Sequence, residues 1–258
     1  MGIVRRSMCF ELDSSLPVPV ISGAAVSHEE LVLEAADGSR FAAFSASPDE
    51  PAGVGVVILP DVRGLYRFYE ELALRFAERG YAAIAFDYFG RTAGVGTRDG
   101  DFEFMPHVQQ LAPDQIQADV GACVASLRAA GASVIFTVGF CMGGRHSWLS
   151  AAGGHSVAGA VGFYGRPGEG QDGSAGPIQR APEMACPILA LQAGDDAHIT
   201  AEDNAAFEEA LRAAGVEHDL VTYSGAPHSF FDRKQEEFQA ASDDAWARVL
   251  AFIERHAG

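Results

Sequence analysis

The sequence predicts an α/β fold in which a mostly parallel β-sheet is covered by helices on both faces. Short runs that are almost wholly apolar, such as residues 54–60, are typical of strands buried on both faces. They alternate along the chain with segments whose apolar residues recur at helical spacing, such as residues 67–79. This alternation is typical of βαβ units, and 258 residues suit one large domain built from them.

Local patterns predict the order of the elements. A hairpin is expected first, because Asp37-Gly38 separates two strand-like runs at residues 31–34 and 41–45. Further strands are expected at residues 54–60, 81–86, 134–138, 157–163, 188–191 and 219–223. Helices are expected at residues 67–79, 113–130, 142–152, 201–214 and 235–256, and glycine-rich loops at residues 91–111 and 165–184.

The N-terminal residues 1–27 are interpreted as an irregular arm, because Pro17, Pro19 and Gly23 interrupt any regular pattern. No part of this arm is apolar enough for a secretory signal. Residues 28–258 are then expected to form a single domain, since neither an internal repeat nor a linker is evident.

Charge and cysteine content restrict the classes of function. The formal net charge of −17 argues against nucleic acid as a partner. No apolar run reaches the roughly 18 residues that a membrane-spanning helix needs, so no membrane association is expected. The four cysteines show neither CxxC spacing nor disulfide density, which favours reduced thiols in the cytoplasm. The cysteines and histidines also lack paired ligand spacing, so no metal site is expected.

The segment Gly-Phe-Cys-Met-Gly-Gly at residues 139–144 carries the most specific pattern. It joins a predicted strand to a predicted helix, as in the nucleophile elbow G-x-S-x-G of α/β-hydrolases, with Cys141 in place of the serine. The flanking glycines leave space for the sharp turn, and a helix N-terminus favours a thiolate. The pattern predicts Cys141 as a nucleophile; the alternative is a buried cysteine in a glycine-rich turn.

A base and an orienting acid are expected further along the chain, because α/β-hydrolases follow the order nucleophile, acid, histidine. Asp195 and Asp196 follow the predicted strand 188–191, and His228 follows the predicted strand 219–223. Sites in parallel sheets lie beyond the carboxyl ends of strands, where all three residues fall. His228 is therefore the predicted base, and the spacing favours Asp196 over Asp195 as the acid.

Several segments together resemble the dienelactone hydrolase family. They are the elbow, Ala-Gly-Asp-Asp-Ala-His-Ile at 193–199, Pro-His-Ser-Phe at 227–230, and the segments 57–64 and 80–91. The resemblance extends over residues 30–257, nearly the whole chain. It implies an α/β-hydrolase fold and a Cys-His-Asp triad that works without a cofactor. The family's namesake opens the lactone ring of dienelactone to give maleylacetate, and many relatives act on other esters.

The resemblance assigns roles to individual residues. It implies that Cys141 is the nucleophile, Asp196 the triad acid and His228 the base. It also implies that the backbone amides of Val62 and Met142 form an oxyanion hole, which stabilises the negative charge of a tetrahedral intermediate.

The remaining family positions concern substrate binding. Asp61 replaces a family glutamate that holds the resting thiol, and is one methylene shorter. Arg91 matches an arginine that contacts a substrate carboxylate, and Tyr164 a tyrosine near the active site. At the position of a second family arginine stands Asp232, with Arg233 one residue later. Arginines at the rim imply an anionic substrate, the alternative being ion pairs with neighbouring aspartates.

Taken together, the sequence predicts a cytoplasmic hydrolase that cleaves a small carboxylic ester or lactone, possibly one that bears a carboxylate, through an acyl-cysteine intermediate. One alternative is a generalist esterase or thioesterase of the same fold. Another is a non-catalytic protein of this fold in which Cys141 is a redox sensor. A nucleotide-binding protein is less favoured, because the chain has no G-x-x-x-x-G-K-[ST] loop.

Overall fold

The computed structural model describes residues 15–258 except for residues 23, 25, 97 and 99. Most of the predicted N-terminal arm, with Cys9, therefore lies outside the described residues. The first strand begins at Val26, earlier than the sequence pattern predicts. It is an edge strand whose polar residues face solvent, so it needs no apolar run to mark its start.

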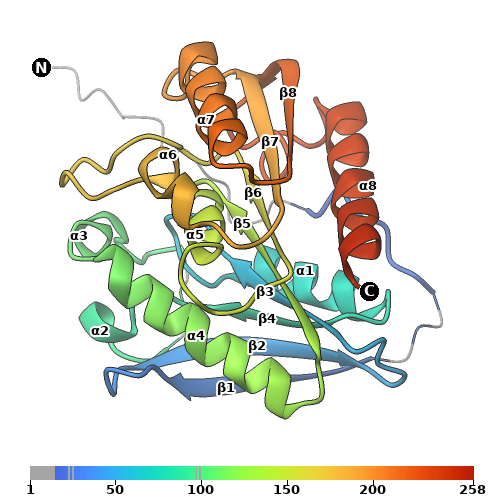
Figure 1. Ribbon diagram of the computed structural model, residues 1–258. Helices are drawn as coiled ribbons and strands as arrows, with labels where there is room; N and C mark the ends of the chain where they lie inside the picture. Colours follow the sequence, from blue (N-terminus) through green and yellow to red (C-terminus); the bar gives the residue numbers. More distant parts are fainter. Residues whose placement is uncertain (1–14, 23, 25, 97, 99) are drawn as a thin grey trace, which may run out of the picture.

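A single eight-stranded sheet forms the centre of the molecule (Figure 1). Its strands lie in the order β1-β2-β4-β3-β5-β6-β7-β8. Strand β2 runs antiparallel to both of its neighbours, and all other neighbouring pairs are parallel. The strands are β1 (Val26–Glu34), β2 (Arg40–Pro48), β3 (Val54–Leu59), β4 (Ala82–Phe86), β5 (Val134–Phe140), β6 (Gly159–Phe163), β7 (Ile188–Asp195) and β8 (His218–Pro227). The prediction of a mostly parallel sheet is confirmed.

The hairpin predicted at Asp37-Gly38 is also present. Gly38 adopts φ = +79°, a conformation that glycine tolerates without steric cost, and the N–H of Ala35 donates to the carbonyl of Ser39 at 2.8 Å. The two strands pair over their full length from Val26 opposite Pro48 to Glu34 opposite Arg40.

Helices cover both faces of the sheet (Figure 1). They are α1 (Arg67–Ala77), α2 (Gly90–Ala93), α3 (Met105–Val108), α4 (Pro113–Ala129), α5 (Met142–Ser150), α6 (Pro177–Arg180), α7 (Ala201–Ala213) and α8 (Gln239–His256). The N-terminus of α7 has the predicted capping box, in which Thr200 and Asp203 each accept the other's backbone N–H.

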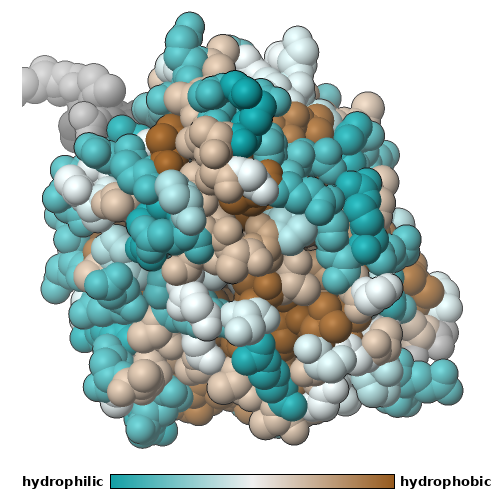
Figure 2. All heavy atoms as spheres, in the orientation of Figure 1, coloured by the Kyte–Doolittle hydropathy of each residue, from teal (hydrophilic) through white to brown (hydrophobic). Residues whose placement is uncertain are grey.

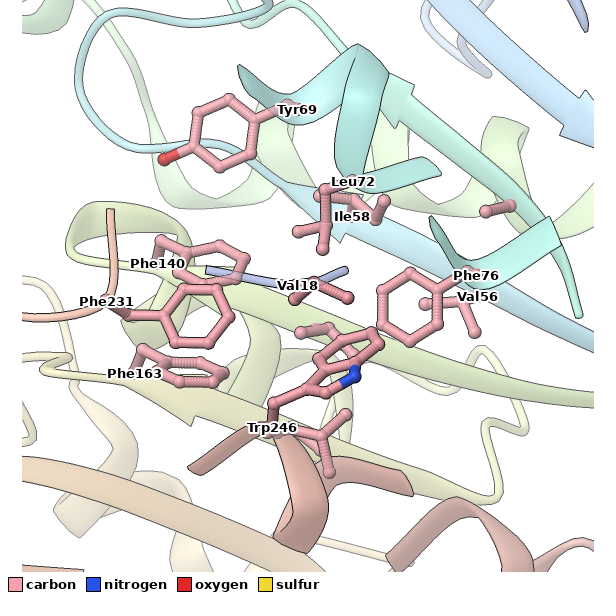
Figure 3. Packing of buried hydrophobic residues seen from close by; sticks show 14 of the residues in the cluster. Val18, Val56, Ile58, Tyr69, Leu72, Phe76, Phe140, Phe163, Phe231 and Trp246 are labelled. Atoms are coloured by element: carbon pink, nitrogen blue, oxygen red, sulfur yellow. The ribbon is translucent and has the colours of Figure 1, made fainter. Parts of the chain in front are cut away.

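Strand β3 shows how one apolar run supplies two cores. Its side chains alternate between the two faces of the sheet. Val56 and Ile58 belong to the core that includes residues of α1 and α8, and Val57 and Leu59 belong to the core that includes residues of α4 and α7. Figure 3 shows part of the first core, in which Trp246 of α8 lies against Phe76 of α1. Burial on both faces explains why the sequence here is continuously apolar.

The predicted loops contain short helices that the sequence pattern does not reveal. Helices α2 and α3 lie within residues 91–111 or at their edge, and α6 and a 3₁₀ turn (Ala181–Glu183) lie within 165–184. A four-residue helix is too short for a recognisable period. Helix α8 begins later than predicted, because Gln235 is part of a turn and donates to the Ser15 carbonyl at 2.7 Å.

Figure 2 shows mainly hydrophilic residues on the face that carries α4 and α6, with hydrophobic residues showing in limited areas between them. Within the described residues, no helix combines the length and apolar character needed to cross a membrane. The same part of the chain has no group of three or more His, Cys, Asp or Glu residues that suits a metal ion.

Candidate active site

The candidate residues gather where four parallel strands end. Cys141 directly follows β5, Tyr164 follows β6, Asp196 follows β7 and His228 follows β8. Strands β7 and β8 pair as far as Asp195 opposite Pro227, after a shift of register. This pairing brings the next residue of each strand, the predicted acid and the predicted base, side by side.

Cys141 occupies a strained turn between β5 and α5. Its φ of 55° and ψ of −115° are unusual for a residue with a Cβ atom. Gly139 and Gly143 permit the turn, because a Cβ at Gly139 would lie 2.0 Å from the Gly143 carbonyl oxygen and one at Gly143 would lie 2.1 Å from that of Leu59. The glycines flanking the elbow are therefore required by close backbone approach, and the half-buried thiol is held at the start of a helix.

His228 and Asp196 form a short hydrogen bond. Nδ1 of His228 lies 2.6 Å from Oδ2 of Asp196, whose side chain is only 1% exposed. The other oxygen of Asp196 accepts the backbone N–H of His198 at 2.9 Å, which fixes the plane of the carboxylate. Asp195 is exposed at the end of β7. The geometry supports the choice of Asp196 over its neighbour.

The protonation of this pair follows from its surroundings. Burial by itself lowers the pKa of His228, but hydrogen bonds to Asp196 and Cys141 outweigh it and raise that pKa to about 10. Burial pushes the pKa of Asp196 upward, yet the hydrogen bond from His228 holds it below the ordinary value. His228 lies between the anionic carboxylate of Asp196 and the thiol of Cys141, and it is thus poised to hold the proton of that thiol.

The two backbone amides that the resemblance implies for an oxyanion hole belong to Met142 and Val62. Met142 is the first residue of α5, so its N–H has no acceptor inside the helix. The chain beyond β3 turns tightly, with the N–H of Gly64 donating to the Asp61 carbonyl at 3.1 Å. Val62 lies within this turn, and its N–H takes no part in the hydrogen bond that closes the turn.

Asp61 is engaged by its own loop. Its buried carboxylate accepts from the backbone N–H of Arg63 at 2.8 Å and from the Arg63 guanidinium at 2.9 Å. The Tyr66 hydroxyl donates to it at 3.2 Å. Burial raises the pKa of Asp61, and the charge of Arg63 opposes that shift. These contacts give Asp61 a partner other than the thiol, and sequence reasoning missed Arg63 altogether.

Arg91 lies in a structural ion-pair network. Its Nε donates to Asp37 at 3.0 Å, and its NH1 donates to the fully buried Asp119 at 2.7 Å. These contacts tie α2 to the β1–β2 turn and to α4. The structure therefore favours the ion-pair alternative over a substrate contact for Arg91, with Asp37 and Asp119 as the partners.

Tyr164 and Asp232 lie near His228. The ring of the buried Tyr164 lies 4.9 Å from the imidazole, centroid to centroid, and its φ of 37° is positive, like that of Cys141. Asp232 is fully buried beside Tyr164, whereas Arg233 is half-buried on the same turn. The structure thus places a carboxyl group where the resemblance implies an arginine.

Alkylation should distinguish Cys141 from the other thiols. Burial raises the pKa of Cys123 well above its ordinary value and that of Cys186 to about 12, so both should react slowly. We expect iodoacetamide to label Cys141 first, as followed by peptide mass spectrometry, with activity lost in step. Cys9 lies outside the described residues, so a Cys9→Ser variant is the control. Labelling of Cys9 first, without loss of activity, would contradict the prediction.

Comparisons with known proteins agree with this architecture. The model of the dienelactone hydrolase family matches residues 41–257. The chain is 29% identical to the carboxymethylenebutenolidase of Rhodococcus opacus over 260 residues, which is 96% of this chain and 97% of that protein. It is also 29% identical over 227 residues to a Yersinia pestis protein named "Putative carboxymethylenebutenolidase", covering 85% of each chain.

Solved structures give the same result. The crystal structure titled "Putative Dienelactone Hydrolase" from Klebsiella pneumoniae superimposes with a TM-score of 0.77 at 26% identity, covering 89% of this chain and 99% of that one. The eight-stranded sheet and its helices are consistent with the α/β-hydrolase fold of such proteins. Because the family model spans most of the chain, the protein belongs to the dienelactone hydrolase family, a family of hydrolase enzymes.

Proposed function

We propose that the protein hydrolyses small carboxylic esters or lactones through an acyl-cysteine intermediate on Cys141. The observation that carries the proposal is the 2.6 Å hydrogen bond between His228 and Asp196, with the Cys141 thiol close enough to raise the pKa of the same imidazole. A nucleophile, a base and an orienting acid in contact are the requirement for this chemistry.

In the first half-reaction, the sulfur of Cys141 attacks the carbonyl carbon of the substrate while His228 holds the thiol proton. A carbon–sulfur bond forms, and the carbonyl oxygen becomes an oxyanion that the N–H groups of Val62 and Met142 stabilise. Each such donor contributes a few kcal/mol to the transition state. When the carbon–oxygen bond breaks, His228 gives its proton to the leaving alcohol.

In the second half-reaction, water attacks the thioester. His228, now neutral, takes a proton from the water, and a second oxyanion forms at the same place. Collapse of this intermediate breaks the carbon–sulfur bond and releases the carboxylic acid. The thiol of Cys141 regains its proton from His228, so the cycle consumes one water for each ester.

A hydrolysis screen with trapping of the intermediate tests this function. We expect turnover of small esters or lactones, and an acid-quenched sample should show the mass of the acyl group on the peptide that contains Cys141. Turnover without an acyl adduct in wild-type protein or in slow variants would contradict the acyl-cysteine step. Absence of hydrolysis together with reversible oxidation of Cys141 would favour the redox-sensor alternative.

The contacts of Arg91 favour a second candidate within the same class, a generalist esterase for neutral substrates. Its guanidinium is bound to Asp37 and Asp119 and its side chain is only 10% exposed. An arginine that already neutralises two carboxylates is poorly disposed to bind a third. This observation favours neutral esters over substrates that bear a carboxylate.

The variant Arg91→Ala separates the two candidates. It would leave the buried carboxylate of Asp119 without its partner, so we expect a loss of about 3–5 kcal/mol in the free energy of unfolding, measured by urea denaturation. Values of kcat/KM for a neutral ester and for a carboxylate-bearing lactone should change by the same factor. A KM increase of roughly tenfold confined to the lactone would instead identify Arg91 as the reader of substrate charge.

A further inference from the structure

A second carboxyl group, Asp232, lies buried near His228 and has no role in the proposed reaction. It is fully buried, and neither oxygen accepts a hydrogen bond of standard geometry from the described part of the chain. The Tyr164 hydroxyl, which also has no hydrogen-bond partner of standard geometry among the described residues, lies close enough to Asp232 to lower the pKa of its carboxyl group. A buried carboxyl group without an ion-pair partner of its own is costly, so its presence here calls for an explanation.

Packing fixes Asp232 next to the elbow. The preceding residue, Phe231, forms a trio of rings with Phe140 and Phe163, at centroid distances of 5.7 and 4.8 Å (Figure 3). Phe140 immediately precedes Cys141, and Phe163 immediately precedes Tyr164. The trio therefore holds the residues that follow its three members, Cys141, Tyr164 and Asp232, in a constant relation to one another.

Asp232 and Asp61 both lie close to the guanidinium of Arg63. That guanidinium is already paired with Asp61 at 2.9 Å. Burial first, and then the charge of Asp61, raise the pKa of Asp232 to about 7, although Arg63 and His228 act in the opposite direction. The groups that face Asp232 are Asp61 and Arg63 from the loop after β3, Tyr69 from α1, Tyr164 from the end of β6, and His228 from its own segment, on which Arg233 also lies.

We propose that Asp232 is a positioning residue whose charge, acting on His228 past the ring of Tyr164, sets how readily the imidazole holds the proton of the Cys141 thiol. With Asp232 ionised, the imidazolium is stabilised and the thiolate of Cys141 is favoured. With Asp232 protonated, that stabilisation is lost. The inference rests on the proposed function, and it adds a pH-dependent control of the same nucleophile.

The rate at which iodoacetamide alkylates Cys141, followed from pH 5 to pH 9, tests the inference without any substrate. The wild-type rate should rise with an inflection near pH 7 that belongs to Asp232. In Asp232→Asn, which keeps the volume of the side chain but cannot ionise, the inflection should disappear. The rate at pH 8 should then fall by about tenfold, the factor that corresponds to one pKa unit on His228, and the rate at pH 5 should stay the same.

Two further variants make the result decisive. Tyr164→Phe removes the hydroxyl that favours the ionised carboxyl, so its inflection should move to higher pH; it also carries the test if Asp232→Asn fails to fold. Asp195→Asn, an exposed carboxylate at the same edge of the sheet, should leave the profile unchanged. An inflection near pH 7 that persists in Asp232→Asn, or that is lost in Asp195→Asn as well, would overturn the inference.

Turnover of p-nitrophenyl acetate, measured in parallel, separates this inference from the proposed function. A wild-type protein that hydrolyses the ester while the alkylation profiles coincide would retain the function and refute the role of Asp232. A protein that alkylates as predicted but shows no hydrolysis of any ester or lactone would refute the function and retain the electrostatic coupling.

Discussion

Replacement of Cys141 by alanine should reduce hydrolysis of p-nitrophenyl acetate by about 10³-fold or more. Loss of a nucleophile removes the covalent route and leaves only the binding and oxyanion contributions. The thiol lies at the apex of a turn that the close approach of Gly139 and Gly143 makes possible, so alanine at the same position should leave the backbone unchanged. Steady-state rates and circular dichroism of both proteins check this result.

Cys123→Ala is the matched control. Cys123 is fully buried among apolar side chains between α4 and the sheet, far from any catalytic role. Its truncation should lower the free energy of unfolding by about 1 kcal/mol while kcat/KM stays within twofold of the wild type. If Cys141→Ala retained most of the activity, or if Cys123→Ala lost it, the elbow cysteine would not be the nucleophile.

Asp196→Asn should lower kcat by about 10²–10⁴-fold, because an amide next to Nδ1 favours the wrong tautomer of the imidazole. The carboxylate of Asp196 lies 2.6 Å from His228 and also raises the pKa of that histidine. The variant should therefore show a lower pKa for His228 as well, measurable by NMR titration of the imidazole.

Asp195→Asn provides the comparison at the adjacent position. Asp195 is exposed at the end of β7, so we expect its kcat and the titration of His228 to match the wild type. A reversed order of effects would mean that the neighbouring aspartate orients the base in solution and that the observed hydrogen bond is not the functional one.

The sequence by itself determines the architecture of this protein to a large extent. Buried parallel strands must be apolar throughout, as β3 is, and the elbow requires glycines at fixed positions around Cys141. Both are constraints between residues close together along the chain, so they can be recognised in the sequence alone. The strand-end positions of Asp196 and His228 follow from the same alternation, because the carboxyl ends of parallel strands share one edge of the sheet.

Only the tertiary structure decides the partners of the other polar residues. Arg91 pairs with Asp37, 54 positions earlier, because the β1–β2 turn comes close to α2 in the folded protein. Asp232 lies beside Tyr164 only because Phe231 packs against Phe140 and Phe163. An ion pair and a buried carboxyl group both depend on which loops surround them and on their exclusion from water. Neither feature produces a periodic pattern along the sequence. The charge environment of Cys141 is therefore a property of the fold, whereas its candidacy as the nucleophile can be predicted from the sequence.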